Sequence, residues 1–165
     1  MIIFGIDPGT AILGWGVIEE KHSSMRMIAC GVVRTPAGDP ADQRLLKLYN
    51  ELSELLQTYK PDAVAIEELF FSKNVTTALP VGQARGVALL ALAQQQIPIF
   101  EYKPLVVKQA VAGYGGADKK QMQEMVRMTL GLQTIPKPDD AADALAVALC
   151  HGYSAPMARR IAESQ

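Results

Sequence analysis

Five short apolar segments, and the lengths of chain between them, constrain the fold of this sequence more than any other feature. Residues 2–7 (IIFGID) are almost continuously apolar, which is typical of a strand covered on both faces. Residues 14–19 and 26–35 follow a Pro-Gly turn and are separated by a polar KHSS stretch, which favours a hairpin. Residues 63–67 and 97–101 come later, after intervals long enough for helices. The chain therefore predicts three strands joined by short turns, followed by strands that alternate with helices.

Helical periodicity fills the later intervals. Between residues 40 and 59, leucine and tyrosine recur at steps of three and four, as on the buried face of an amphipathic helix. Pro80 lies inside the next helical segment and is expected to start, kink or split it. The order β-β-β-α-β-α-β-α-α-α predicts an α/β fold with a mixed five-stranded sheet flanked by helices. The further helices are expected at about 75–95, 104–112, 118–130 and 139–152.

Length and composition set three limits. The 165 residues leave room for one domain, which we assign to residues 1–153, followed by a polar and loose tail at 154–165. The longest nearly apolar stretch, 86–93, is far shorter than the roughly 20 residues of a membrane span. No basic region precedes the first apolar run, and Cys30 and Cys150 lack the spacing of a metal site. These features predict a cytoplasmic protein that does not interact with membranes.

Four carboxylates occupy positions where an acid is costly to bury. Asp7 ends the first apolar strand and Glu67 ends the fourth. Asp140 and Asp143 are three residues apart, so both leave one face of an alanine-rich helix. Taken singly, Asp7 fits a turn cap and Glu67 fits an exposed strand end. Taken together, acids at the ends of three apolar elements indicate a single cluster.

A cluster of four carboxylates needs a counter-charge. Like charges a few ångströms apart repel each other strongly, so bound cations are required to keep all four acids ionised. Oxygen ligands without histidine or cysteine select hard ions, and we expect Mg²⁺, with Mn²⁺ as a substitute. Two such ions about 3.5–4 Å apart stabilise the attacking and leaving oxygens of a phosphoryl displacement. The acids therefore predict a metal-dependent phosphodiester nuclease.

The formal net charge of −1 hides an uneven distribution. Residues 71–137 contain eight lysines and arginines against three acids, a net charge of +5. Asp118 begins a helix with capping-box spacing, so Lys119 and Lys120 fall in its first turn, where cations oppose the helix dipole. Phosphate binding would explain this unfavourable choice, and solvated lysines beside a mobile loop are the alternative.

Aromatic residues and glycines near these segments indicate close contacts. The glycine-rich loop around Tyr114 precedes the two lysines and is flexible enough to follow a DNA backbone. Of Phe70 and Phe71, one ring is expected in the core and the other beside the acids, where it would stack on an unpaired base. Gly14 and Gly16 interrupt a strand, which indicates that another element approaches its backbone closely.

Six motifs, in order, resemble the RuvC family of bacterial Holliday-junction resolvases over residues 2–152. The resemblance implies a ribonuclease-H-like fold and a homodimer that nicks two opposed strands of a four-way DNA junction with Mg²⁺, in DNA recombination and repair. It also implies cooperation with the branch-migration proteins RuvA and RuvB. The motifs are GIDPGT (5–10), GWGVI (14–18), AIEELFF (65–71), GQARGVALL (82–90), the segment 107–119 and DAADALAVAL (140–149).

The resemblance also assigns roles to single residues. The family's catalytic acids, which hold two metal ions in each active site, fall on Asp7, Glu67, Asp140 and Asp143. Its junction-contacting aromatic residue and functional lysines fall on Phe70, Lys108 and Lys119. To these DNA contacts we add Tyr114 and Lys120 from the analysis of the basic segment.

Three other functions remain open at this point. A different ribonuclease-H-like nuclease would act on RNA or on other branched DNA. A junction-binding module without catalysis would not need all four acids. Half of an actin-like ATPase would share the phosphate loop GIDPGT, but such enzymes need two domains around the nucleotide and this chain supplies one.

Overall fold

The computed structural model describes residues 1–163 except residue 23 and residues 69–74. Its elements follow the predicted order. The strands are β1 (Ile2–Asp7), β2 (Ile12–Lys21), β3 (Ser24–Arg34), β4 (Ala63–Glu67) and β5 (Ile99–Tyr102). The helices are α1 (Ala41–Tyr59), α2 (Val75–Gln94), α3 (Pro104–Ala112), α4 (Lys119–Thr129) and α5 (Asp139–Glu163).

The five strands form one mixed sheet in the order β3-β2-β1-β4-β5. β1 pairs with β2, and β2 with β3, in antiparallel fashion. β4 joins the other side of β1 in parallel, and β5 extends the sheet parallel to β4. The predicted mixed five-stranded sheet is therefore confirmed, with the first strand at its centre.

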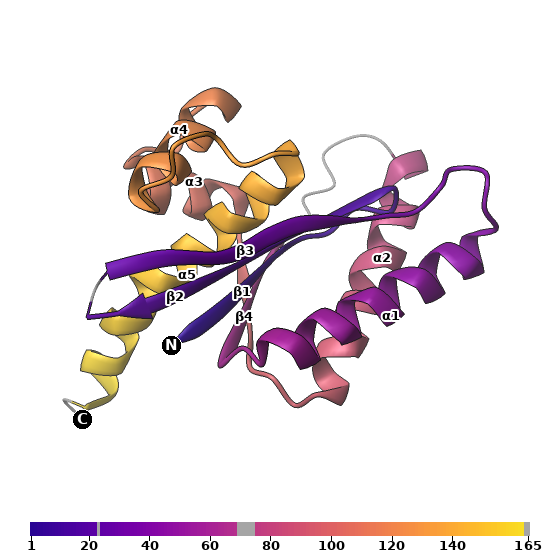
Figure 1. Ribbon diagram of the computed structural model, residues 1–165, viewed down its shortest axis with the longest axis horizontal. Coiled ribbons are helices and arrows are strands. Elements are labelled where there is room, and N and C mark those ends of the chain that lie inside the picture. Colours follow the sequence, from indigo (N-terminus) through magenta and orange to yellow (C-terminus); the bar gives the residue numbers. More distant parts are fainter. Residues whose placement is uncertain (23, 69–74, 164–165) are drawn as a thin grey trace.

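Helices cover both faces of the sheet (Figure 1). On one face, Phe4 of β1 shares a buried cluster with Leu52 of α1 and with alanines of α2. On the other face, Ile3 of β1 shares a second cluster with Leu145 of α5 and with apolar side chains of α3 and α4. Alternate residues of β1 thus serve two separate cores, which explains why its sequence is almost continuously apolar.

Glycines let α5 lie directly on the sheet. A Cβ atom on Gly14 would stand 2.0 Å from the backbone oxygen of Asp140, and one on Gly5 would stand 2.1 Å from that of Ala144. A Cβ atom on Gly16 would meet the Leu145 side chain at 2.7 Å. The predicted close approach to the glycines of β2 is confirmed, and the approaching element is α5. This contact fixes the start of α5 against the ends of β1 and β2.

The end of α5 corrects the sequence-based prediction. We expected the helix to stop near residue 152, but the helical backbone runs on to Glu163. The loose character of residues 154–165 stays a prediction. Gly152 lies inside this helix, where a Cβ atom would come within 2.9 Å of the Met25 side chain in β3. The alanines and arginines that follow are strong helix formers, and they continue the helix through Pro156.

Three smaller expectations can also be compared with the structure. α2 is one helix through Pro80, so this proline neither starts nor splits it. β5 begins at Ile99, two residues later than expected. Cys30 and Cys150 are free thiols. Within the described residues, no helix is long and apolar enough to cross a lipid bilayer.

Candidate active site

Two of the predicted acids lie side by side because β1 and β4 are parallel neighbours. Ile6 of β1 pairs with Ile66 of β4, so the next residues, Asp7 and Glu67, leave the sheet together at the same edge. Both side chains are half-buried. The carboxyl ends of adjacent parallel strands are a frequent location for binding sites in α/β proteins.

The start of α5 brings the other two acids to this edge. Gly14 is the partner of Asp7 across the β1–β2 ladder, and Gly14 is also the residue on which the backbone of Asp140 rests. Asp143 follows on the next turn of the same helix face. The buried Ala141 and Ala142 keep this turn close to the sheet. The convergence predicted from the sequence is therefore found in the structure.

The electrostatics show that these carboxylates act on each other. Burial, followed by the charges of Glu67, Asp143 and Asp140, raises the pKa of Asp7 to about 7. Burial and the charge of Asp143 also raise the pKa of Glu67, against the opposing effect of Lys108. The pKa of Asp143 is raised mainly by burial, while Lys119 acts to lower it. Protonation of Asp7, Glu67 and Asp143 is thus favoured unless positive charge is added beside them.

Two lysines supply part of that positive charge. A pocket of about 160 Å³ is lined by Glu67, Asp143, Lys108 and Lys119 together with apolar residues of α3, α4 and α5. The Lys119 ammonium lies 3.2 Å from the Asp143 carboxylate and 3.6 Å from that of Asp139. The unfavourable interaction of Lys119 with the dipole of α4 is therefore offset by its ion pairs to α5.

The donor set fits a hard divalent cation. The side chains that converge here offer carboxylate oxygens, and burial, followed by the charges of the neighbouring acids, raises the pKa of Asp7. In the described part of the chain, no three acid, histidine or cysteine side chains are already arranged to hold a metal ion together. Lys119 pairs with Asp143 in this arrangement, so a cation would share that carboxylate with it or replace it.

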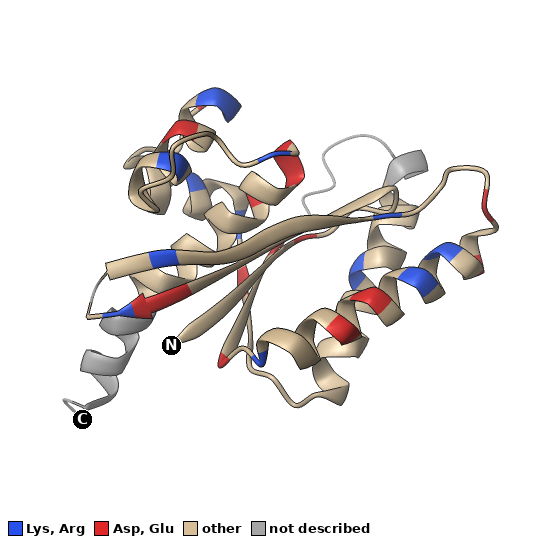
Figure 2. Ribbon diagram, in the orientation of Figure 1, with Lys and Arg blue, Asp and Glu red and all other residues tan. Residues whose placement is uncertain are grey.

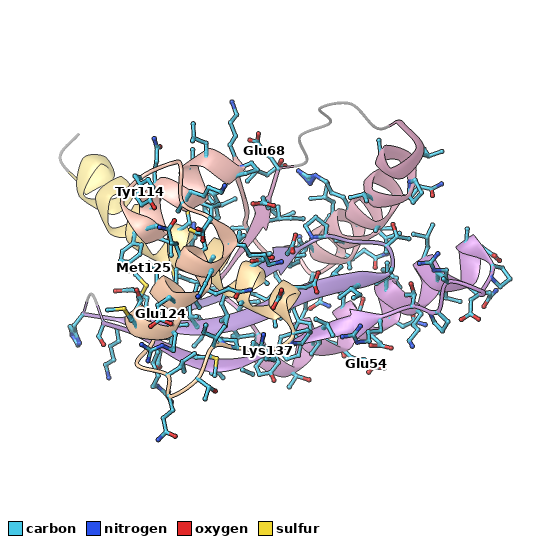
Figure 3. The ribbon with its side chains drawn as sticks, turned by 90° about the horizontal axis from the view of Figure 1, so that it is seen from above. Glu54, Glu68, Tyr114, Glu124, Met125 and Lys137 are labelled. Atoms are coloured by element: carbon cyan, nitrogen blue, oxygen red, sulfur yellow. The ribbon has the colours of Figure 1, made fainter. Side chains whose placement is uncertain are left out.

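The remaining predicted DNA contacts lie elsewhere. Tyr114 and Lys120 line a separate hollow of about 380 Å³ between the end of α3 and α4, with Met125 beside them (Figure 3). The Tyr114 hydroxyl donates a hydrogen bond to the Gln121 side chain at 2.6 Å. Both residues are exposed, but the acids do not line this hollow. Phe70 lies outside the described residues.

The capping box predicted for α4 is confirmed and helps to position the site. The Asp118 carboxylate accepts a hydrogen bond from the Gln121 backbone at 2.8 Å, and the Gln121 side chain accepts one from the Asp118 backbone at 2.9 Å. This fixes the first turn of α4, which carries Lys119, in front of α5.

Asp139, whose assistance to the site the sequence left open, belongs to the site's charge network. It pairs with Lys119 and, at 3.6 Å, with Lys137 on the segment before α5. Figure 2 shows the acidic start of α5 next to the basic residue on that segment. In the sequence, only the position of Asp139 directly before Asp140 indicated a link to the site. The two lysines that pair with it come from other segments, which the sequence alone does not bring together.

Comparison with known proteins identifies relatives of the whole chain. The family described as "Crossover junction endodeoxyribonuclease RuvC" matches residues 3–151. A crossover junction endodeoxyribonuclease RuvC from Chloroflexus aurantiacus is 66% identical over 160 residues, which cover 97% of this chain and 98% of the relative.

Solved structures agree with this match. The Thermus thermophilus RuvC structure superposes with a TM-score of 0.89 at 40% identity, over 96% of this chain and 97% of the other. A structure of T. thermophilus RuvC in complex with a Holliday junction substrate superposes with a TM-score of 0.87 at 38% identity, over 95% and 96% of the two chains. The ribonuclease-H-like fold implied by the sequence motifs is therefore confirmed.

Proposed function

Because this chain belongs to the RuvC family of crossover junction endodeoxyribonucleases, we propose that its cluster of four carboxylates is the catalytic centre with which it resolves Holliday junctions. The endonuclease activity follows from the family, and the location of the centre rests on one observation. Asp7 stands among Glu67, Asp140 and Asp143, close enough for each to raise its pKa. Neither the ATPase nor the non-catalytic alternative is favoured by these relatives.

The acids are proposed to hold Mg²⁺, two ions in each centre, with Mn²⁺ as a substitute. When bound, such ions polarise the scissile phosphate and lower the pKa of a water nucleophile. The carboxylates of Asp7 and Glu67 would serve as ligands from the sheet, and those of Asp140 and Asp143 as ligands from α5. An all-oxygen donor set supports a hard divalent cation.

The lysines of the pocket are proposed to act on the substrate. Lys108 and Lys119 line the same small pocket as Glu67 and Asp143, and a phosphate bound at the acids is proposed to contact both ammonium groups. Their charge would offset the repulsion between the carboxylates and the DNA backbone and would orient the scissile phosphate. Tyr114, Lys120 and Phe70 are proposed as further DNA contacts away from the reacting atoms.

A homodimer is proposed as the working unit, because two equivalent centres match two equivalent strands of a junction. One face of α2 supports this assignment. Among the described residues, no atom lies within 4 Å of where a Cβ atom on Gly82 or Gly86 would stand. On the same face, Leu79 and Leu90 are 68% and 55% exposed. Such a surface is suited to close packing against a second copy. Cooperation with RuvA and RuvB and a cytoplasmic location are proposed from the family alone.

The test compares three substrates under two conditions. The protein is incubated with a four-way junction, a linear duplex of the same sequence and an RNA–DNA hybrid, in Mg²⁺ or in EDTA. We expect paired, symmetric nicks in the junction with Mg²⁺ only. We also expect Asp7→Asn and Glu67→Gln to bind the junction without cutting it. Cleavage of the hybrid in preference to the junction, or full activity of Asp7→Asn, would contradict the proposal.

A further inference from the structure

Lys119 is shared between a carboxylate of the proposed centre and one outside it. Its ammonium lies 3.2 Å from Asp143 and 3.6 Å from Asp139. Asp139 and Asp143 are four residues apart on α5, so they project on the same side of the helix, one turn from each other. The lysine reaches this pair from the first turn of α4. Asp139 is therefore linked to Asp143 of the proposed centre by an ammonium group that pairs with both carboxylates.

Asp139 is itself held in place. Lys137 Nζ lies 3.6 Å from its other carboxylate oxygen, and Lys137 belongs to the segment that leads into α5 (Figure 3). Asp139 thus forms ion pairs with two lysines that come from different segments, one on each of its carboxylate oxygens.

The backbone of Lys119 is fixed, but its side chain is not. The capping box of α4 holds the first turn, whereas the Lys119 side chain is 55% exposed and has four rotatable bonds to order. Asp143 can restrain it only while its carboxylate is free to pair. If Asp143 ligates a divalent cation, that carboxylate is neutralised, and the ammonium is repelled from it. Asp139, which is not among the four proposed ligands, keeps its charge.

We propose that Asp139 is a positioning residue for Lys119, which it retains at the edge of the catalytic centre, facing the substrate phosphate, once Asp143 has taken up its ligand role. This inference rests on the proposed function. It assigns Asp139 a task that its sequence position as a helix-start acid does not require.

The proposal predicts that removal of the Asp139 charge changes junction affinity in the direction opposite to that expected from repulsion of the DNA alone. An acid beside a DNA-binding surface repels the backbone, so its removal should strengthen binding. If Asp139 positions Lys119, Asp139→Asn instead weakens junction binding, by about two- to fivefold as for the loss of a partly exposed ion pair. The loss should be larger in Ca²⁺ than in EDTA, because in EDTA Asp143 still restrains the lysine.

The experiment is a double-mutant cycle on junction affinity. Wild type, Asp139→Asn, Lys119→Gln and the double variant are titrated with a fluorescent four-way junction in EDTA and in Ca²⁺, at several salt concentrations. We expect Asp139→Asn to cost nothing further in the Lys119→Gln background. Asp139→Glu should restore most of the affinity, and the charge-matched Asp39→Asn, in the loop before α1, should not weaken it. Thermal unfolding of each variant checks the fold.

The possible failures are distinguishable. Additive effects, or tighter binding by Asp139→Asn in both backgrounds, would overturn the role of Asp139 and leave the proposed function intact. Lys119→Gln with the affinity of wild type would also overturn it, because there would be no lysine contact to position. If the wild-type protein neither bound nor cut the junction, the proposed function itself would fail.

Discussion

Neutralising Asp7 should make the protein more stable at alkaline pH, although we expect it to abolish cleavage. The pKa of Asp7 rises from 3.8 to about 7 in the folded protein, through burial first and then through Glu67, Asp143 and Asp140. A carboxyl with a raised pKa stabilises the folded state while it is protonated there. That contribution is fully present below pH 3.8 and is lost as the pH rises through about 7. At pH 8 the folded protein therefore carries a half-buried charge that Lys119 offsets only in part.

The size of the effect follows from the pKa shift. Each pKa unit is worth about 1.4 kcal/mol, so a rise of roughly three units corresponds to about 4 kcal/mol in total. Between pH 5 and pH 8.5, the portion that changes is about 3 kcal/mol. Asparagine does not titrate, and any cost of burying its amide is the same at every pH. The difference in unfolding free energy between Asp7→Asn and wild type should thus grow by about 3 kcal/mol over this range.

Urea unfolding in EDTA, followed by tryptophan fluorescence and circular dichroism at half-unit steps of pH, measures this difference. Asp39→Asn, an exposed carboxyl remote from the cluster, is the matched control and should show no such trend. Adding Mg²⁺ at pH 8 should stabilise wild type and leave Asp7→Asn almost unchanged. A difference that stays flat from pH 5 to 8.5 would refute the conclusion that Asp7 is buried among like charges.

Three further predictions concern the scaffold, the pocket and the dimer. Gly14→Ala should cost about 1–3 kcal/mol of stability and most of the cleavage rate, because its Cβ would lie 2.0 Å from the Asp140 backbone oxygen. The control Gly38→Ala, whose Cβ meets no described atom within 4 Å, should change neither quantity. Chemical denaturation measures the stability and a nicking assay measures the cleavage rate. Lys108→Gln should lower the slope of log affinity against log salt by about 0.9, and the remote Lys47→Gln should leave it unchanged. Leu90→Glu should yield monomers in light scattering. The control Leu46→Glu, at a leucine of α1 that is 51% exposed, should leave the dimer intact.

The positions of Asp7 and Glu67 at strand ends could be predicted from the sequence, because local patterns identify the strands. An apolar run that ends in Asp7 and another that ends in Glu67 are recognisable as strands. The glycines of β2 also indicated the close approach of another element, which α5 makes. These inferences needed only the period of the sequence and the chemistry of single residues.

Features that depend on contacts between distant segments were not predictable in the same way. The contact of Gly152 with Met25 of β3 cannot be read from either segment alone. Lys119 resembles a free phosphate contact until α4 is seen to face α5, where Asp139 and Asp143 pair with it. The adjacency of β1 and β4 likewise depends on a crossover through α1 that no local pattern specifies.

The charge arrangement explains why the near-neutral net charge is compatible with DNA binding. Burial and repulsion raise the pKa values of Asp7, Glu67 and Asp143, so the centre gains stability from any cation that approaches it. Lys119 already forms such an ion pair with Asp143. The same ammonium is proposed to contact the substrate phosphate, and it cannot serve both partners fully at once. If substrate and metal bind as proposed, we expect the pair with Asp143 to loosen, and we expect Asp139, the lysine's other partner, to retain the ammonium beside the centre.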